Sequence, residues 1–241
     1  MKQNLKLQFK YGAPGVQLLA VGMLLLALPS RAQQPTPQQR VEALKVTLAT
    51  SQAMLKPYEW VETTVVTSKG KEKSRQMNQC YNGADGKVQK VPLTTPPPEK
   101  KKPGLRGKIA ENKSEELADY MKEAIGLVKV YMPPTPVLIQ SAKDAGRVAA
   151  QPLSAQLVRL TFTGYLKPGD SLALDVDLAN NRPVNAKVST YLDSPKEPVT
   201  LDVRFSTLEN NAVYPASIVL NAKGKDLKVD VTNSGYRPAG R

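Results

Sequence analysis

Apolar and polar positions alternate with a period of two residues along most of the chain after residue 156. Val158, Leu160 and Phe162 are apolar, and Arg159 and Thr161 lie between them. Short turns rich in Gly, Asn, Asp and Pro separate the repeats of this pattern, which fall in residues 171–178, 184–188, 199–206, 214–220 and 227–231. Strands that are apolar on one face and joined by short turns predict a large antiparallel sheet. Its apolar face must be covered by helices, by a second sheet or by the sheet itself.

A second group of strands is predicted nearer the N-terminus. Residues 58–68 alternate and are rich in β-branched side chains, which favour strands. The polar run 71–82, a turn at 82–86 and residues 87–93 follow. These segments are typical of an antiparallel meander.

Three helices are predicted from apolar spacing. The first spans 37–55, because Thr36, Pro37 and Gln39 form a capping pattern before an apolar stripe. The second begins at Ser114 and ends before Met132, and a short third one covers 135–145. The stripe of the second helix is either a packed structural face or a mobile lid over a cavity.

The alternation also predicts which strand residues face inward. We expect Phe162, Leu174, Val203 and Ile218 to be protected, and Arg159, Asp175, Arg204 and Ser217 to be more exposed, since side chains alternate between the two faces. The inward residues form the wall of an apolar cavity or an ordinary core. The candidate ligand-lining residues are Val158, Leu160, Phe162, Leu174, Val176, Val203, Phe205, Ile218 and Leu220.

The N-terminus has the pattern of a secretory signal peptide. Lys2, Lys6 and Lys10 precede the apolar run Val16–Leu28, and Ser30-Arg31-Ala32 has the small-x-small pattern of a signal-peptide cleavage site. We expect cleavage after Ala32, with residues 1–32 as the signal peptide and 33–241 as a single domain. An uncleaved N-terminal anchor is the alternative, although the run is short for a membrane span.

A strongly basic, proline-rich segment interrupts the chain at 94–113. It is predicted to be an exposed loop, and the chain as a whole has a formal net charge of +13. The loop is either a docking site for an anionic membrane surface or a solvated insertion. Nucleic acid is not an expected partner, because the aromatic residues are scattered rather than interleaved with the charges. The candidate docking residues are Lys100, Lys101, Lys102, Arg106 and Lys108.

The composition removes several kinds of catalysis. The chain has no histidine, which rules out Ser-His-Asp and Cys-His catalysis and zinc sites that contain histidine. Cys80 is the single cysteine, so no intramolecular disulfide forms, and we expect it to be a small strand residue. Asp175 and Asp177 share one face of a strand, and paired carboxylates can serve acid–base chemistry, but we favour the interpretation that they are exposed strand residues near a turn. We expect no enzymatic activity, no cofactor and no metal.

Three segments near the C-terminus carry a family resemblance. They are Asp177-Leu-Ala-Asn180-Asn-Arg-Pro183, the alternating run Val199 to Phe205 with Pro215 after it, and Val229-x-Val231-x-Asn233-Ser234-x-Tyr236. Together with the order of helix, strands, central helices and final hairpins, this pattern resembles the periplasmic lipoprotein-carrier family (LolA-like) over most of 37–236. The basic insertion at 94–113 departs from that family's pattern.

The resemblance implies an α+β fold, in which a strongly curved antiparallel sheet, or unclosed β-barrel, holds helices in or over its concave face. It also implies a periplasmic, monomeric carrier or chaperone for lipid, lipoprotein or other acyl-bearing cargo. The alternative is an envelope protein-interaction or stress-sensor module whose core is filled by its own helices.

Overall fold

The computed structural model describes residues 37–94, 105–132, 134 and 136–240. The predicted signal peptide and Lys100, Lys101 and Lys102 lie outside the described residues. Residues Pro35–Arg241 form one compact unit.

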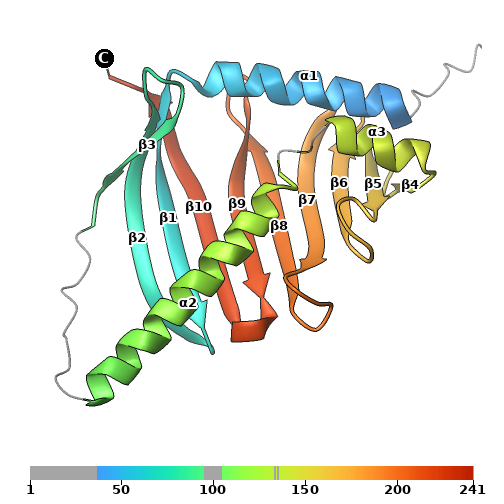
Figure 1. Ribbon diagram of the computed structural model, residues 1–241. Coiled ribbons are helices and arrows are strands. Elements are labelled where there is room, and N and C mark those ends of the chain that lie inside the picture. Colours follow the sequence, from blue (N-terminus) through green and yellow to red (C-terminus); the bar gives the residue numbers. More distant parts are fainter. Residues whose placement is uncertain (1–36, 95–104, 133, 135, 241) are drawn as a thin grey trace, which may run out of the picture. The chain divides into compact units, whose positions relative to one another are not determined.

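The described strands form a single antiparallel sheet of ten strands, in the order β3-β2-β1-β10-β9-β8-β7-β6-β5-β4. Among these strands, β3 and β4 are the two edges and do not pair with each other, so the curved sheet stays open (Figure 1). The predicted α+β class with an unclosed, curved sheet is therefore confirmed. The strands are β1 (Tyr58–Ser68), β2 (Lys71–Asn82), β3 (Val88–Pro92), β4 (Val148–Pro152), β5 (Leu157–Thr163), β6 (Ser171–Asp177), β7 (Arg182–Tyr191), β8 (Pro198–Thr207), β9 (Val213–Ala222) and β10 (Leu227–Pro238).

The pairing of β1 with β10 joins the two groups of strands that the sequence predicts separately. Tyr58 lies opposite Pro238 and Ser68 opposite Leu227, so the first and last strands of the chain run side by side. Every other neighbouring pair is consecutive in the chain, which is why short turns suffice. β4 was not predicted from the sequence, because its five residues are too few to display a clear alternation.

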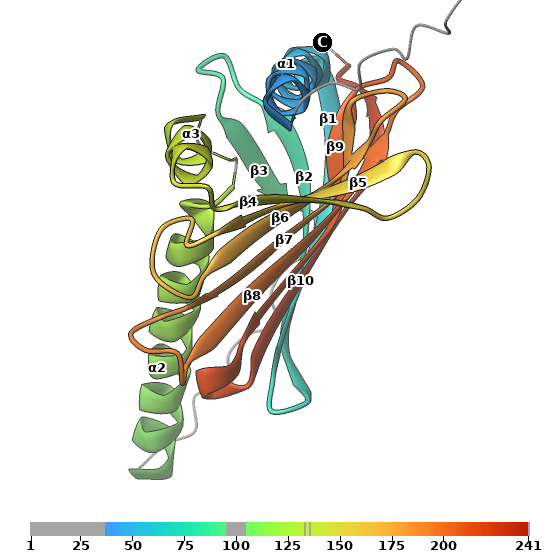
Figure 2. The same cartoon turned by 90° about the vertical axis from the view of Figure 1, so that its right-hand side faces the viewer.

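The helices α1 (Pro37–Leu55), α2 (Leu105–Lys129) and α3 (Pro136–Asp144) all lie on one side of the sheet (Figure 2). We call the side of the sheet that they cover the inner face. α1 runs along one end of the strands, and α2 crosses the sheet diagonally (Figure 1). None of these described helices is both long enough and apolar enough to cross a membrane.

The start of α2 corrects one prediction. The helix begins at Leu105 rather than at Ser114, so residues 105–113 of the predicted loop are helical. Ser114 resembles a capping residue, but here it lies in the middle of the helix. Serine can compete with a helix by bonding to nearby backbone groups, but tertiary packing of the helix's apolar side can outweigh that competition. Tyr120, Ala124 and Val128 of α2 are buried on this side.

The exposure of Asp175, on the outer face of the sheet, differs from the prediction. Asp175 is 7 % exposed, although it was expected on the exposed face. Arg159 covers it with a two-pronged ion pair, Nε to Oδ1 at 2.6 Å and the terminal Nη2 to Oδ2 at 2.8 Å. The carboxylate therefore faces outward yet is shielded from water by its neighbour.

Candidate ligand-binding face

One cross-strand row of the inner face shows how the helices cover it. The row runs from β5 through β6, β7, β8, β9 and β10 to β1. Each residue in it lies directly opposite the next one on the neighbouring strand. Leu160, Leu174 and Val203 are 0 %, 2 % and 4 % exposed, whereas Ile218 and Val231 are only half-buried. The full row is Leu160, Leu174, Ala186, Val203, Ile218, Val231 and Thr64. Exposure along this row therefore rises between β8 and β9. The adjacent row stays buried across the same strands, through Leu201, Leu220, Val229 and Val66.

The predicted ligand-lining residues follow this division only in part, because Phe205 of β8 is half-buried and Leu220 of β9 is buried. All of them belong to or pack against one apolar cluster on the inner face. Phe205 and Ile218 are half-buried, and the other members are buried inside the cluster: Val158, Leu160, Phe162, Leu174, Val176, Val203 and Leu220. Phe162, Leu174 and Val203 thus have the predicted protection, while Ile218 and its neighbour Ser217 have similar, intermediate exposure. Arg204 is exposed, as expected.

The packed half of the inner face, which we define as β5–β8, is closed by a tyrosine at the C-terminal end of α2. Tyr131 is 0 % exposed, and its hydroxyl donates to Asp170 Oδ2 at 2.6 Å. The same hydroxyl lies 2.7 Å from Thr190 Oγ1. Asp170 Oδ2 also accepts the backbone N–H groups of Leu166 and Lys167. Burial, together with the bond to Asp170, raises the pKa of Tyr131 above its ordinary value.

α2 is also attached near its middle. Glu116 forms an ion pair with Lys225, which lies in the short helix η1 (Lys223–Lys225) between β9 and β10. The hydroxyl of Tyr120 packs so closely on Gly224 that a Cβ added there would lie 2.6 Å from it. Gly224 is therefore required for the close approach of α2 to this turn.

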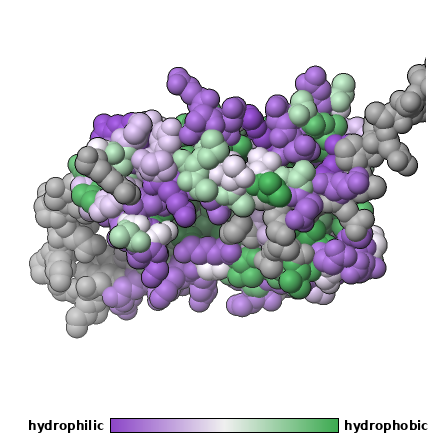
Figure 3. All heavy atoms as spheres, turned by 90° about the horizontal axis from the view of Figure 1, so that it is seen from above, coloured by the Kyte–Doolittle hydropathy of each residue, from purple (hydrophilic) through white to green (hydrophobic). Residues whose placement is uncertain are grey.

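The open half of the inner face, which we define as β9, β10, β1 and β2, is apolar in its middle. Ile218 and Val231 lie there, and Met121 and Ile125 of α2 are also half-buried against the core. Seen along the direction of the strands, from the side of α1, the surface is hollowed, and apolar residues form the floor of the recess (Figure 3). Apolar side chains from two layers thus remain partly accessible in the same part of the molecule.

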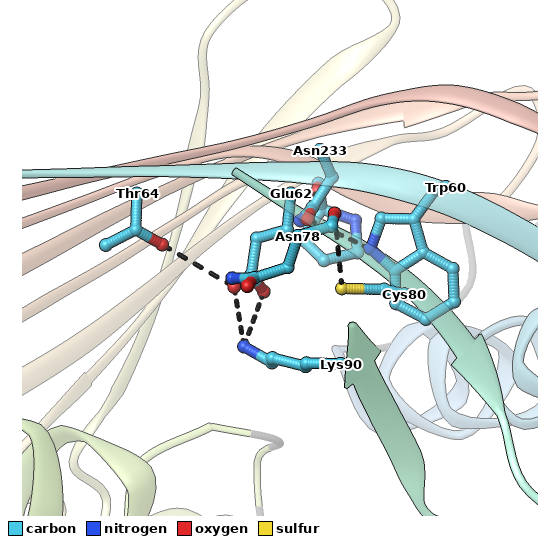
Figure 4. Close-up of polar contacts among 8 residues, drawn as sticks. Trp60, Glu62, Thr64, Asn78, Cys80, Lys90 and Asn233 are labelled. Carbon is cyan, nitrogen blue, oxygen red and sulfur yellow. Dashed lines mark hydrogen bonds and ion pairs between the residues drawn. The ribbon is translucent and has the colours of Figure 1, made fainter. Parts of the chain in front are cut away.

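A polar and aromatic cluster continues this face beyond the apolar strip (Figure 4). Trp60 donates its indole N–H to Asn233 Oδ1 at 3.1 Å, and Asn233 donates to the carbonyl of Pro215 at 2.8 Å. Lys90 Nζ reaches both oxygens of Glu62, at 2.6 and 2.8 Å. We call Trp60, Glu62, Asn78, Lys90, Tyr214, Asn233 and Tyr236 the polar–aromatic cluster.

A bulge in β10 brings Tyr236 into this cluster. Gly235 has a φ of +63°, and the register between β1 and β10 shifts between Glu59 and Val61. The extra residue places Tyr236 on the same face as Asn233. Its ring stacks on Trp60 with centroids 5.4 Å apart and approaches Tyr214 at 4.3 Å. Burial raises the pKa of Tyr236.

Cys80 lies beside this cluster in β2, a strand position as predicted, and its side chain is fully buried. Burial and the neighbouring Glu62 raise the pKa of its thiol. A thiol held in its protonated form is a poor nucleophile. The side chain therefore fills space under the cluster rather than supplying chemistry.

The two aspartates considered as a carboxylate pair are each engaged elsewhere. Asp175 pairs with Arg159, and Asp177 accepts the backbone N–H of Ala179 at 2.9 Å and the amide of Asn180 at 2.8 Å. These bonds lower the pKa of Asp177. Within the described part of the chain, no three His, Cys, Asp or Glu side chains are grouped so as to hold a metal ion. What the inner face offers is an apolar surface with a polar border.

The residues that make the two halves differ were not predicted from the sequence. Tyr131, Asp170 and Thr190 are distant in sequence, and nothing in their local pattern links them. A glycine inside a strand is a recognised sign of a bulge, so Gly235 was the available signal for the placement of Tyr236.

Comparisons with known proteins agree with the predicted resemblance at the level of structure. The chain is structurally similar to a LolA superfamily protein from Nitrosomonas europaea, with 11% identity, a TM-score of 0.37, and 82% of this chain and 94% of that chain covered. A domain titled as an outer membrane lipoprotein-sorting protein, from Vibrio parahaemolyticus, matches with 10% identity, a TM-score of 0.35, and coverage of 82% and 92%. A DUF1329 family protein from Desulfovibrio piger matches with 9% identity, a TM-score of 0.34, and coverage of 81% and 93%.

Neither a protein-family model nor a curated protein sequence matches the chain significantly. With TM-scores below 0.5, the structural likenesses say nothing of function. The functional argument therefore has to come from the side chains of this chain.

Proposed function

We propose that the protein is an exported, non-enzymatic carrier or chaperone, which binds acyl chains of lipid, lipoprotein or similar cargo on the open half of its inner face. The predicted signal peptide supports export, and the predicted family resemblance supports a periplasmic location. Cofactors and metals have no part in this function.

The observation that carries the proposal is the change in coverage along one aliphatic row. Leu160, Leu174 and Val203 are sealed by the helices, but Ile218 and Val231 are left partly accessible. Leaving aliphatic side chains accessible gives up free energy, about 25 cal/mol for each Å² of apolar surface not removed from water. An acyl chain lying along the row would recover that free energy.

The polar–aromatic cluster is suited to the polar end of such a cargo. Lys90 has a side chain that is 50 % exposed, and Glu62, Asn78 and Asn233 offer further hydrogen-bonding groups beside it. An apolar strip that ends in polar side chains matches a molecule with an acyl chain and a polar headgroup. The cluster would fix the direction in which the chain lies.

The alternative function is a protein-interaction or sensor module with a filled core. It is favoured by the packed half, where Tyr131 seals the inner face and its hydroxyl is fully bonded. The two functions differ in one respect: a carrier binds an acyl chain on the open half, and an interaction module does not.

The test uses Trp60, which is the single tryptophan of the chain and lies on the inner face. A fatty acid brominated along its chain quenches tryptophan fluorescence only at short range. We expect saturable quenching by the brominated probe and none by its unbrominated parent.

A pair of adjacent variants makes the test specific. Ile218→Lys places a charge on the inner face, whereas Val219→Lys places the same charge on the outer face between Asp202 and Asp230. Because strand side chains alternate, the two changes differ only in the face they alter. Ile218→Lys should abolish quenching with the thermal transition retained, and Val219→Lys should leave quenching intact. Equal quenching in both variants, or none in the parent protein, would reject the carrier and favour the filled-core module.

A further inference from the structure

Two neighbouring turns at one end of the sheet gather basic side chains. These are the turn between β1 and β2 and the segment η1 between β9 and β10. They are joined directly, because Lys69 N–H donates to the carbonyl of Asp226 at 3.0 Å and Ser68 Oγ to the carbonyl of Lys225 at 3.3 Å. Both lie at the end of the strands opposite α1 (Figure 1). These turns and the first residues of the strands that follow them, β2 and β10, carry Lys69, Lys71, Lys73, Arg75, Lys223, Lys225 and Lys228 against Glu72 and Asp226.

Several of these cations have no acidic partner within the described part of the chain. Arg75 pairs with Glu72, Lys225 with Glu116, and Lys228 with Asp230. No ion pair joins Lys69, Lys71, Lys73 or Lys223 to an acidic group among the described residues, and all four side chains are exposed. We call these four lysines the basic end.

The charge is specific to this end. The turns at the other end, 82–87, 178–182 and 208–212, carry Lys87 and Arg182 balanced by Asp85 and Glu209. The neighbouring turn 192–197 at the basic end adds Lys196, Asp193 and Glu197, so its own contribution is acidic. Like charges packed on joined turns repel one another, and an anionic surface relieves that repulsion.

We propose that the basic end is a docking surface for membranes that contain anionic lipids. Lys69 and Lys223 lie in the two joined turns and Lys71 and Lys73 at the start of β2, so these exposed lysines are near one another at the tip of the sheet and several can approach a flat anionic surface together. Each basic residue close to such a surface strengthens binding about fivefold, which is about 1 kcal/mol. This inference does not depend on what the inner face carries, because the basic end lies at the tips of the strands.

The test measures binding to lipid vesicles. The full chain is expressed with its own N-terminal segment, purified as the cell processes it, and sedimented with phosphatidylcholine vesicles that contain about 30 % phosphatidylglycerol. Binding should fall steeply between about 0.05 M and about 0.3 M salt, because salt screens exposed charges. Pure phosphatidylcholine vesicles should bind weakly at both salt concentrations.

Two triple variants with the same change in charge identify the surface. Lys71→Glu, Lys73→Glu and Lys223→Glu together reverse the basic end, and we expect binding about a hundredfold weaker. Lys56→Glu, Lys87→Glu and Lys122→Glu reverse three lysines elsewhere and serve as the matched control, which should lose much less. Equal losses in the two triples, or equal binding to neutral and anionic vesicles, would overturn the proposal. Quenching of Trp60 by the acyl probe should survive in both triples, so failure of docking and failure of the carrier function are separable.

Discussion

The two halves of the inner face start from the same kind of strand and end with different degrees of burial. In the packed half, β5–β8, aliphatic residues are buried, α3 contacts β5, α1 contacts β7, and Tyr131 bonds to Asp170 and Thr190. In the open half, β9, β10, β1 and β2, one row is half-buried at Ile218 and Val231 and ends in polar Thr64, although Leu220, Val229 and Val66 beside it are buried. The difference teaches that alternation specifies which face a residue occupies, while the path of the helices decides whether that face is closed.

The largest expected effect is on the free energy of unfolding, and it differs between a buried and a half-buried position of one row. Leu160→Ala should lower the free energy of unfolding by about 3 kcal/mol, because it leaves a cavity in a fully buried site. Ile218→Ala should cost only about 1 kcal/mol, because its side chain is already partly in water and the site can relax. Denaturant unfolding with a shared slope measures both values. Similar costs at the two positions would mean that the open half is packed as tightly as the other.

The next expected effect concerns the seal of the packed half. Tyr131→Phe removes a buried hydroxyl and should cost about 2 kcal/mol at neutral pH, because Asp170 and Thr190 each lose a partner. Tyr191→Phe is the matched control, since its hydroxyl donates to the carbonyl of Pro168 at an exposed site. The control should cost less than about 1 kcal/mol.

The same variant has an alkaline signature. The pKa of Tyr131 is raised above its ordinary value of 10.0 in the folded protein, so the folded state keeps a proton that the unfolded chain loses. This contribution to stability is complete below pH 10 and is lost as the pH rises above it, with a slope of up to about 1.4 kcal/mol per pH unit. Tyr131→Phe should show a shallower decline than the parent protein between about pH 10 and pH 11. An unchanged slope would show that the hydroxyl is accessible to water.

The elements of the sheet could be predicted from the sequence to a large extent, and the difference between its halves could not. The strands from 157 onward and the helix over 37–55 were found, because alternation and helical spacing are local. The early start of α2 was missed, because Ser114 looks like a cap and the packing of Tyr120 on Gly224 is not local.

The candidate site shows the same limit of local patterns. The inward parity of Phe162, Leu174 and Val203 follows from a period of two. The exposure of Ile218 depends on where α2 crosses the sheet, and the position of Tyr236 depends on the bulge at Gly235. Alternation could not predict the exposure of Ile218, because tertiary packing sets it. It could not predict the position of Tyr236, because the bulge breaks the period of two.

The smallest expected effect tests whether the border of the open half is organised by hydrogen bonds. Asn233 accepts the indole N–H of Trp60 and donates to the carbonyl of Pro215. Asn233→Ala removes both bonds and should cost about 1 kcal/mol, with a changed emission of Trp60, since the site is only partly buried and water replaces part of what is lost. Asn233→Asp keeps an acceptor for the indole but loses the amide donor. If the indole bond positions the ring, Asn233→Asp should retain the parent emission and Asn233→Ala should not. Identical emission in both variants would instead mean that stacking on Tyr236 alone holds Trp60 in place, and that the polar–aromatic cluster is ordered by its rings rather than by its amides.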